Sequence, residues 1–143
     1  MAGPNLTNAL EIADYARRAG WPDELIPTAV AIAMAESMGD PEAEGDVKAG
    51  EKSAKWGPSL GWWQIRSLDA ERGTGGFRDA DLLRDRLTNA QAALAAYRER
   101  GSFEPWTVYT SGKYEQYLPD AEIALEVLKT FVPNPNLETR WAD

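Results

Sequence analysis

The feature that most constrains the fold of this chain is a helical periodicity of apolar residues. Its clearest instance is a stripe near the N-terminus, formed by Leu6, Ala9, Leu10, Ala13 and Ala16. Residues at these spacings lie on one face of a helix, and glycine commonly ends a helix at a position like that of Gly20. The pattern predicts a first helix from about Leu6 to Ala19 and a chain that is mainly α-helical.

Further helices follow from start and stop signals along the chain. Pro27 suits the first turn of a second helix, which we expect to end at Gly39. A short helical piece is predicted around residues 80–84, and the capping-box pattern of Thr88–Gln91 opens a helix that Gly101 closes. These helices leave little room for a sheet.

The C-terminal part of the chain is predicted from a last apolar stripe and the prolines after it. A helix over about 120–131 carries four residues that we expect to face inward: Ala124, Val127, Leu128 and Phe131. The sequence Pro-Asn-Pro-Asn at 133–136 ends this helix, because proline cannot continue one. We expect one domain over residues 1–132 and an extended C-terminal tail over residues 133–143.

The residue types that are missing narrow the available chemistry. The 143 residues include no cysteine and no histidine, which excludes thiolate nucleophiles, Ser-His catalysis and the commonest zinc sites. We expect no metal and no cofactor. The formal net charge of −8 argues against nucleic acid as a partner, since phosphate binding needs a basic surface. No apolar run approaches the roughly 20 residues that span a bilayer, so membrane insertion is not expected.

Glu36 is a catalytic candidate because it continues an apolar helix face. Ile26, Ala29, Ala33 and Glu36 share one face of the second predicted helix, which places the carboxyl group at the edge of an apolar region. It also lies in the last turn, where the negative end of the helix dipole disfavours a carboxylate. Both effects are expected to raise the pKa of Glu36, and glycoside cleavage requires a protonated carboxylic acid. The alternative is a glutamate that points to solvent at a helix end.

A tryptophan-rich segment overlaps the end of the polar stretch 40–59, which we interpret as a long loop with room for a small hairpin. Three tryptophans, several glycines and a glutamine lie within Trp56–Leu68. Flat aromatic faces cover the C–H side of a sugar ring and amides bond its polar groups, so Trp62, Trp63 and Gln64 are candidate substrate contacts. The alternative is that Trp62 or Trp63 is core and the glycines are turns. We expect one of these two tryptophans to be in the core whatever the function.

Three blocks carry a family resemblance when they are taken together. They are Ala-Ile-Ala-Met-Ala-Glu-Ser at 31–37, Ser-Leu-Gly-Trp-Trp-Gln-Ile at 59–65 and Trp-Thr-Val-Tyr-Thr-Ser-Gly at 106–112. In this order and spacing they resemble the lytic transglycosylase branch of the lysozyme superfamily, especially phage-encoded domains related to soluble lytic transglycosylases and goose-type lysozymes. The resemblance covers roughly residues 22–118, and the third block adds Trp106 and Tyr109 as candidate substrate contacts.

The resemblance implies a lysozyme-like single domain with a small irregular or hairpin region after the catalytic helix. It implies cleavage of the β-1,4 MurNAc–GlcNAc bond of peptidoglycan, with Glu36 as general acid and then base. It places Ser59, Gln64 and Tyr109 in the cleft, where they hold the substrate and the glutamate. This sequence departs from the family pattern at three positions. Met38 stands where glycine is common, Trp62 stands where leucine or methionine is usual, and Thr110 stands where asparagine is common.

The cleavage can proceed with or without water as the nucleophile. A hydrolytic lysozyme generally needs a second carboxylate, whereas a lytic transglycosylase uses one glutamate and lets the muramic acid 6-hydroxyl attack. Asp46, beside Gly45, is the best candidate second carboxylate, because a turn there could aim it into the cleft. The other interpretation of this acidic stretch is a solvated loop, and we therefore expect the transglycosylase reaction.

The setting of the domain is predicted only in outline. The N-terminus lacks a basic stretch followed by an apolar one, so no secretory signal is visible. We expect the domain to reach the bacterial cell wall as a tail-associated lysin of a bacteriophage virion, within a larger assembly or longer chain, or as an endolysin with a separate export partner. The alternative from a different class is a non-catalytic wall-binding virion module.

Overall fold

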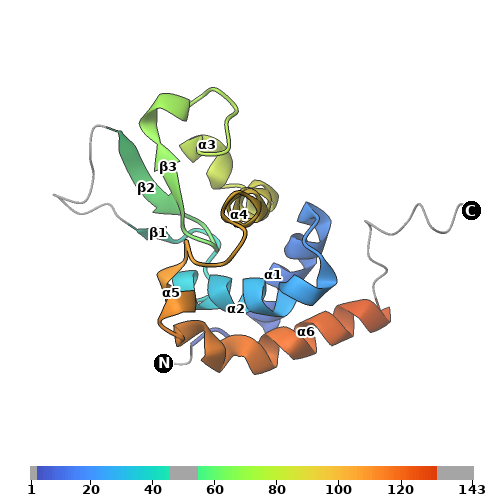
Figure 1. Cartoon of the computed structure of the whole chain (residues 1–143). Helices are drawn as coiled ribbons and strands as arrows, with labels where there is room; N and C mark the ends of the chain where they lie inside the picture. The colour runs from blue at the N-terminus through green and yellow to red at the C-terminus, as the bar shows by residue number, and fades with distance from the viewer. Residues whose placement is uncertain (1–2, 46–54, 132–143) are drawn as a thin grey trace, which may run out of the picture.

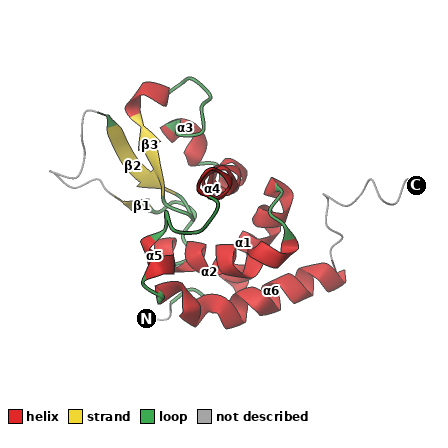
Figure 2. Cartoon of the chain, viewed as in Figure 1, coloured by secondary structure: helices red, strands yellow, loops and turns green. Residues whose placement is uncertain are grey.

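Six α-helices and a three-stranded sheet make up the part of the chain that the computed structural model describes, residues 3–45 and 55–131. The α-helices are α1 (Leu6–Ala19), α2 (Ile26–Ser37), α3 (Ala80–Leu83), α4 (Arg86–Arg100), α5 (Thr107–Thr110) and α6 (Leu118–Phe131). The strands are β1 (Glu44–Gly45), β2 (Trp56–Leu60) and β3 (Ile65–Leu68), and the 3-10 helices are η1 (Asp23–Leu25), η2 (Asp69–Glu71) and η3 (Lys113–Tyr117). Figure 2 confirms the predicted mainly helical fold with a small hairpin region after the second helix.

Local sequence signals set the ends of the first two helices. α1 begins with a capping box and ends at Gly20, whose φ of 104° is left-handed, so its bounds agree with the prediction. α2 ends at Ser37, two residues before the predicted end. The reason is that Met38 already adopts a left-handed conformation with a φ of 55°.

α4 lies between two parts of the molecule (Figure 1). On one side, α1, α2 and α6 pack against one another; on the other side, α3 packs against β2 and β3. α4 contacts α1 as well as α3 and β3, and α5 packs against α2. α2 therefore contacts both the helices of the first part and α5.

The sheet is antiparallel throughout, in the order β1-β2-β3. Ser59 of β2 is the central residue of the register, because it lies opposite Gly45 on one side and Arg66 on the other. The turn between β2 and β3 contains two residues with positive φ, Gly61 at 76° and Gln64 at 48°. The predicted hairpin is therefore built partly from the polar stretch and partly from the tryptophan-rich segment.

Asn89 of α4 holds the β2–β3 turn from inside the core. Its Nδ2 donates to the carbonyl oxygens of Leu60 at 2.8 Å and Leu83 at 3.0 Å, and its Oδ1 accepts the backbone N–H of Trp63 at 3.1 Å. Asn89 is only 1% exposed, so these bonds replace water for every hydrogen-bonding atom of the amide. Gly61 admits no side chain, because a Cβ there would lie 2.4 Å from Asn89 Nδ2.

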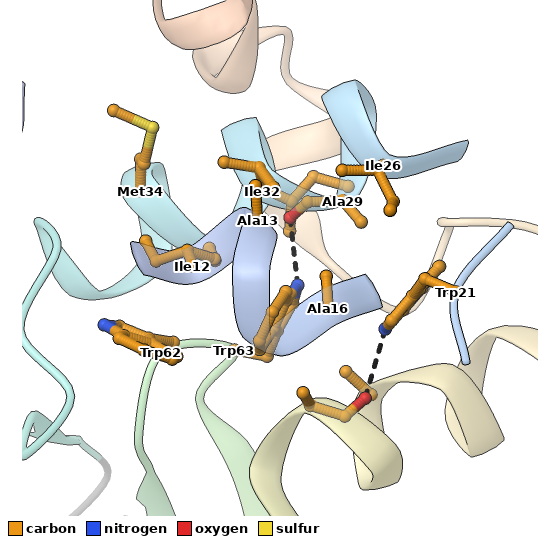
Figure 3. Packing of buried hydrophobic residues seen from close by; sticks show 14 of the residues in the cluster. Ile12, Ala13, Ala16, Trp21, Ile26, Ala29, Ile32, Met34, Trp62 and Trp63 are labelled. Atoms are coloured by element: carbon orange, nitrogen blue, oxygen red, sulfur yellow. Dashed lines mark hydrogen bonds between the residues drawn. The ribbon is translucent and has the colours of Figure 1, made fainter. Parts of the chain in front are cut away.

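Three tryptophans anchor the core that joins the two parts of the molecule (Figure 3). Trp21, Trp62 and Trp63 are each at most 1% exposed, and the Trp63 ring centroid lies 6.4 Å from that of Trp21 and 6.2 Å from that of Trp62. The Trp63 indole N–H donates to the carbonyl of Ala29 on α2 at 2.9 Å. Buried indoles contribute a large apolar area, and their N–H groups need partners of this kind.

Two predictions about the later helices are wrong. The N-cap of α4 is Asp85 and not Thr88, because the Asp85 carboxylate accepts the backbone N–H of Thr88 at 2.9 Å. Phe131 does not face inward: it is 77% exposed in the last turn of α6, where no described element covers it. The buried face of α6 consists of Ala121, Ala124, Leu125 and Leu128.

The predicted tail, residues 133–143, lies outside the described residues. Among the described helices, none combines the length and the apolar character that crossing a membrane requires.

Candidate active site

A cleft of about 600 Å³ opens between the end of α2, the sheet and the start of α5. Its volume is in the range typical of sites for small ligands. The lining combines one carboxylate, two guanidinium groups, two indoles and a few hydroxyl and amide groups. The lining residues are Glu36, Gly45, Trp56, Ser59, Gln64, Ile65, Arg66, Arg78, Ala96, Pro105, Trp106 and Thr107.

Glu36 is the only carboxylate among the lining residues in the described part of the chain. It is half-buried and lies in the last turn of α2. The three apolar residues predicted to share its face, Ile26, Ala29 and Ala33, are completely buried, which confirms the predicted stripe. The carboxyl group therefore lies where a buried helix leaves the core, next to the negative end of the helix dipole.

Hydrogen bonds of the residues just after Glu36 hold the end of α2 in place. The Ser37 hydroxyl donates to the carbonyl of Ala33 at 2.8 Å, and the indole N–H of Trp62 donates to the carbonyl of Gly39 at 3.2 Å. Between them, Met38 has the left-handed φ at which glycine is unstrained. This conformation gives a physical reason why glycine is common at this position in the family that the sequence resembles.

Ser59 and Gln64, which the family resemblance places in the cleft, both line it from the hairpin. Ser59 is 5% exposed and lies in the middle of the sheet register. The side-chain amide of Gln64 is held in place, because its Nε2 donates to the carbonyls of Ala43 at 3.1 Å and Gly61 at 3.0 Å. Its Oε1 lies against Gly45, where a Cβ would be 2.5 Å away. The amide thus ties the residue just before β1 to the β2–β3 turn at the edge of the cleft.

Trp106 closes the cleft from the side of α5. It is the N-cap residue of α5, it is 4% exposed, and its indole N–H donates to the carbonyl of Trp63 at 2.9 Å. This bond ties the start of α5 to the end of the β2–β3 turn, so the two walls of the cleft are joined through the core.

A protein-family model described as a lysozyme like domain matches residues 13–108, more than half of the chain. This protein belongs to the lysozyme-like domain family. The matched residues include Glu36 and every other residue that lines the cleft. Neither a search of curated proteins nor a search of solved structures found a match.

Membership in the lysozyme-like domain family indicates enzymatic activity on peptidoglycan, the polymer of the bacterial cell wall. It confirms the superfamily that the three sequence blocks resemble, and the helical fold with its small sheet agrees with it. Family membership therefore indicates the substrate class, peptidoglycan, and the site of action, the bacterial cell wall.

The structure does not bring Trp62 and Trp63 of the lysozyme-like domain to the lining of the cleft. Both rings are in the core, at 1% and 0% exposure, although the sequence analysis expected only one of them there. The Trp62 indole N–H holds the turn after α2 through the carbonyl of Gly39, and the Trp63 indole N–H holds the first half of α2 through the carbonyl of Ala29. The aromatic rings that do line the cleft are Trp56 and Trp106.

Tyr109 also lies away from the lining of the cleft. Its half-buried ring packs against Phe103 at 5.5 Å and Tyr114 at 5.1 Å between centroids. Asp46, the candidate second carboxylate, lies outside the described residues.

Two lining residues, Arg66 and Arg78, were not among the sequence-predicted contacts. Arg66 directly follows the block 59–65, so its place on β3 could have been inferred from the hairpin. Arg78 carries no such signal, because it comes from the irregular segment before α3 and reaches the cleft only through the tertiary fold.

Proposed function

We propose that this lysozyme-like domain is a lytic transglycosylase that cleaves the β-1,4 MurNAc–GlcNAc bond of peptidoglycan, with Glu36 as general acid and then base. The observation that carries the proposal is that Glu36 is the one carboxylate lining the cleft in the described part of the chain. Ser59 and Gln64 line the same cleft with a hydroxyl group and an amide, although the two N–H groups of that amide are already bonded within the protein.

The two proton transfers require one carboxyl group that changes role. In the first, protonated Glu36 donates its proton to the glycosidic oxygen, and the bond from that oxygen to the muramic acid C1 breaks. In the second, the Glu36 carboxylate accepts the proton of the muramic acid 6-hydroxyl as its oxygen bonds to C1, which gives a 1,6-anhydro ring and restores the acid. The raised pKa that the sequence analysis expects for Glu36, from the helix dipole and the apolar face of α2, would favour the protonated form before the reaction and stays a prediction.

Hydrolysis by a lysozyme reaction is the alternative within the same family. It generally needs a second carboxylate, which activates water or attacks the sugar. Asp46 follows Gly45, a lining residue, and is the candidate for that role. A non-catalytic wall-binding module is the alternative from another class; on that interpretation Glu36 is dispensable.

The test compares wild type with Glu36→Gln on purified cell wall. The amide keeps the shape of the side chain but cannot donate the proton, so we expect a loss of about 10²–10⁴-fold in the rate of clearing, with an unchanged melting temperature. Glu42→Gln is the matched control, because Glu42 is exposed and does not line the cleft. Equal clearing by wild type and Glu36→Gln would rule out the proposed role of Glu36.

The products separate the two reactions. Mass spectrometry of the soluble fragments should show ends that are lighter by one water than those of a hydrolysed glycan, and no new reducing ends. Reducing ends would assign the domain to the hydrolases and make Asp46→Asn the next variant. Absence of clearing by the wild type would favour the wall-binding module.

A further inference from the structure

We propose that Arg78, together with Arg66 and Trp56, forms a subsite for a carboxylate of the peptide stem that substitutes the glycan strand. The proposal rests on the proposed function, since it takes peptidoglycan as the occupant of the cleft. It adds a determinant that selects stem-bearing strands over bare glycan.

A cationic cluster surrounds Trp56 at the cleft. Three cationic groups lie near the Trp56 ring centroid: Lys55 Nζ at 5.3 Å, Arg78 Cζ at 5.4 Å and Arg66 Cζ at 5.9 Å. Cation–π attraction favours the placement of these groups beside the indole ring. The chain as a whole carries a net charge of −8, so this positive cluster is a local exception.

Arg78 is held in a position from which it can bind an anion. Its Nη1 donates to the carbonyl of Arg66 at 2.7 Å, and its backbone N–H donates to Glu71 Oε1 at 2.9 Å. In residues 3–45 and 55–131, no carboxylate forms an ion pair with the Arg78 guanidinium. A guanidinium has five N–H donors in a planar fork that matches a carboxylate, and most of those of Arg78 remain for a ligand.

The centre of the cluster, the Trp56 ring, is displaced along the hairpin from the groups nearest the turn, and Arg66 extends towards it from a position nearer the turn, since its Nε donates to the carbonyl of Gly57 at 2.6 Å. Trp56 pairs with Leu68 at the open end of the β2–β3 hairpin, whereas Ser59 pairs with Arg66 closer to the turn. Three residues of extended strand correspond to about 10 Å between Trp56 and Ser59. A glycan strand that lies along the hairpin therefore presents one group to the turn and a different group to the open end of the hairpin.

The chemistry of peptidoglycan identifies which group fits the cluster. GlcNAc is uncharged, and the lactyl carboxyl group of MurNAc is consumed in the amide bond to the stem. The carboxylates of the peptide stem are thus the anionic groups of the polymer, and they project from the strand as substituents. A fixed arginine beside an indole suits such a carboxylate through charge-assisted hydrogen bonds and apolar contact with its carbon chain.

The experiment measures binding rather than cleavage. Co-sedimentation is carried out in the Glu36→Gln background with three polymers: intact cell wall, glycan strands stripped of stems by an amidase, and cell wall stripped of phosphate-containing polymers. Arg78→Gln is compared with Arg72→Gln, a matched change of charge at an exposed residue of the same part of the molecule that does not line the cleft.

We expect Arg78→Gln to weaken binding to intact wall about tenfold, the size of one charge-assisted hydrogen bond. The same loss is expected on wall stripped of phosphate polymers, because the stems remain. On stem-free strands, the dissociation constant of Arg78→Gln should approach that of its Glu36→Gln parent, so that their ratio falls towards one. Arg72→Gln should bind intact wall as its parent does.

Three outcomes would overturn the subsite. One is an equal loss on all three polymers, and another is a loss that disappears when the phosphate polymers are removed. The third is an equal loss in Arg72→Gln. If Arg78→Gln folds poorly, the salt dependence of the unaltered chain replaces it: its preference for intact wall over stem-free strands should decline as sodium chloride is raised, and a salt-independent preference contradicts the proposal. Because none of these readouts needs turnover, failure of the subsite is separate from failure of the proposed reaction.

Discussion

Replacing Asn89 with alanine should destabilise the domain more than any exposed substitution on the same helix. The change removes three buried hydrogen bonds, two to the carbonyls of Leu60 and Leu83 and one from the backbone N–H of Trp63. Each backbone group left without a partner in the core costs about 1–3 kcal/mol, so the lower bound for three groups is about 3 kcal/mol. A water molecule that enters the space left by the amide would replace part of these bonds, which makes the lower bound the better expectation.

The expected loss converts to a shift in melting temperature. Unfolding entropy is roughly 2.1 cal/mol/K per residue, which is about 0.3 kcal/mol/K for 143 residues. A loss of about 3 kcal/mol therefore lowers the melting temperature by about 10 °C. Circular dichroism at 222 nm measures it, and Gln91→Ala, an exposed change on α4, is the control that should melt within about 2 °C of wild type.

A small shift for Asn89→Ala would refute the reasoning. If its melting temperature lies within about 2 °C of wild type, the amide does not hold the turn as described. A second observation tests the link to the site: at a temperature where the variant is folded, wall binding should still decrease, because Asn89 secures the turn that presents Gln64.

Two further predictions concern the backbone of the site and the acid stability of the fold. Met38→Gly should raise the free energy of unfolding by about 0.5–1 kcal/mol, measured in urea melts. Glycine removes the strain of the left-handed conformation, about 1–2 kcal/mol, but its greater freedom in the unfolded chain offsets part of that gain. An unchanged or lower free energy of unfolding contradicts this reasoning. The backbone N–H of Gly75 lowers the pKa of Asp79, with desolvation opposing and the N–H of Asp81 assisting. Since the folded-state pKa is depressed, this carboxylate stabilises the fold above about pH 4 and the contribution is lost as the pH falls through the folded-state pKa. In Asp79→Asn, the free energy of unfolding should therefore fall less steeply as the pH is lowered below about 4 than it does in wild type. An identical decrease in both proteins would contradict this role of Asp79.

The sequence by itself determined the helical framework and the place of the candidate acid within it. The bounds of α1 follow from its stripe and Gly20, and the position of Glu36 at the end of the buried face of α2 follows from residue spacing alone. These features are local, because one helix turn brings the relevant residues together. The three sequence blocks likewise indicated the family without any knowledge of packing.

Only the tertiary structure decided which polar and aromatic side chains face the cleft. The sequence allows Trp62 and Trp63 to be either core residues or sugar contacts, because an indole suits both environments. In the folded chain both are in the core, where the carbonyls of Gly39 and Ala29 accept their indole N–H groups. Arg78 comes from an irregular segment, and its position beside Trp56 depends on how that segment packs on the hairpin. Periodicity identifies an apolar face, but it does not identify the partner that covers that face, which is why Phe131 was expected inside and lies exposed.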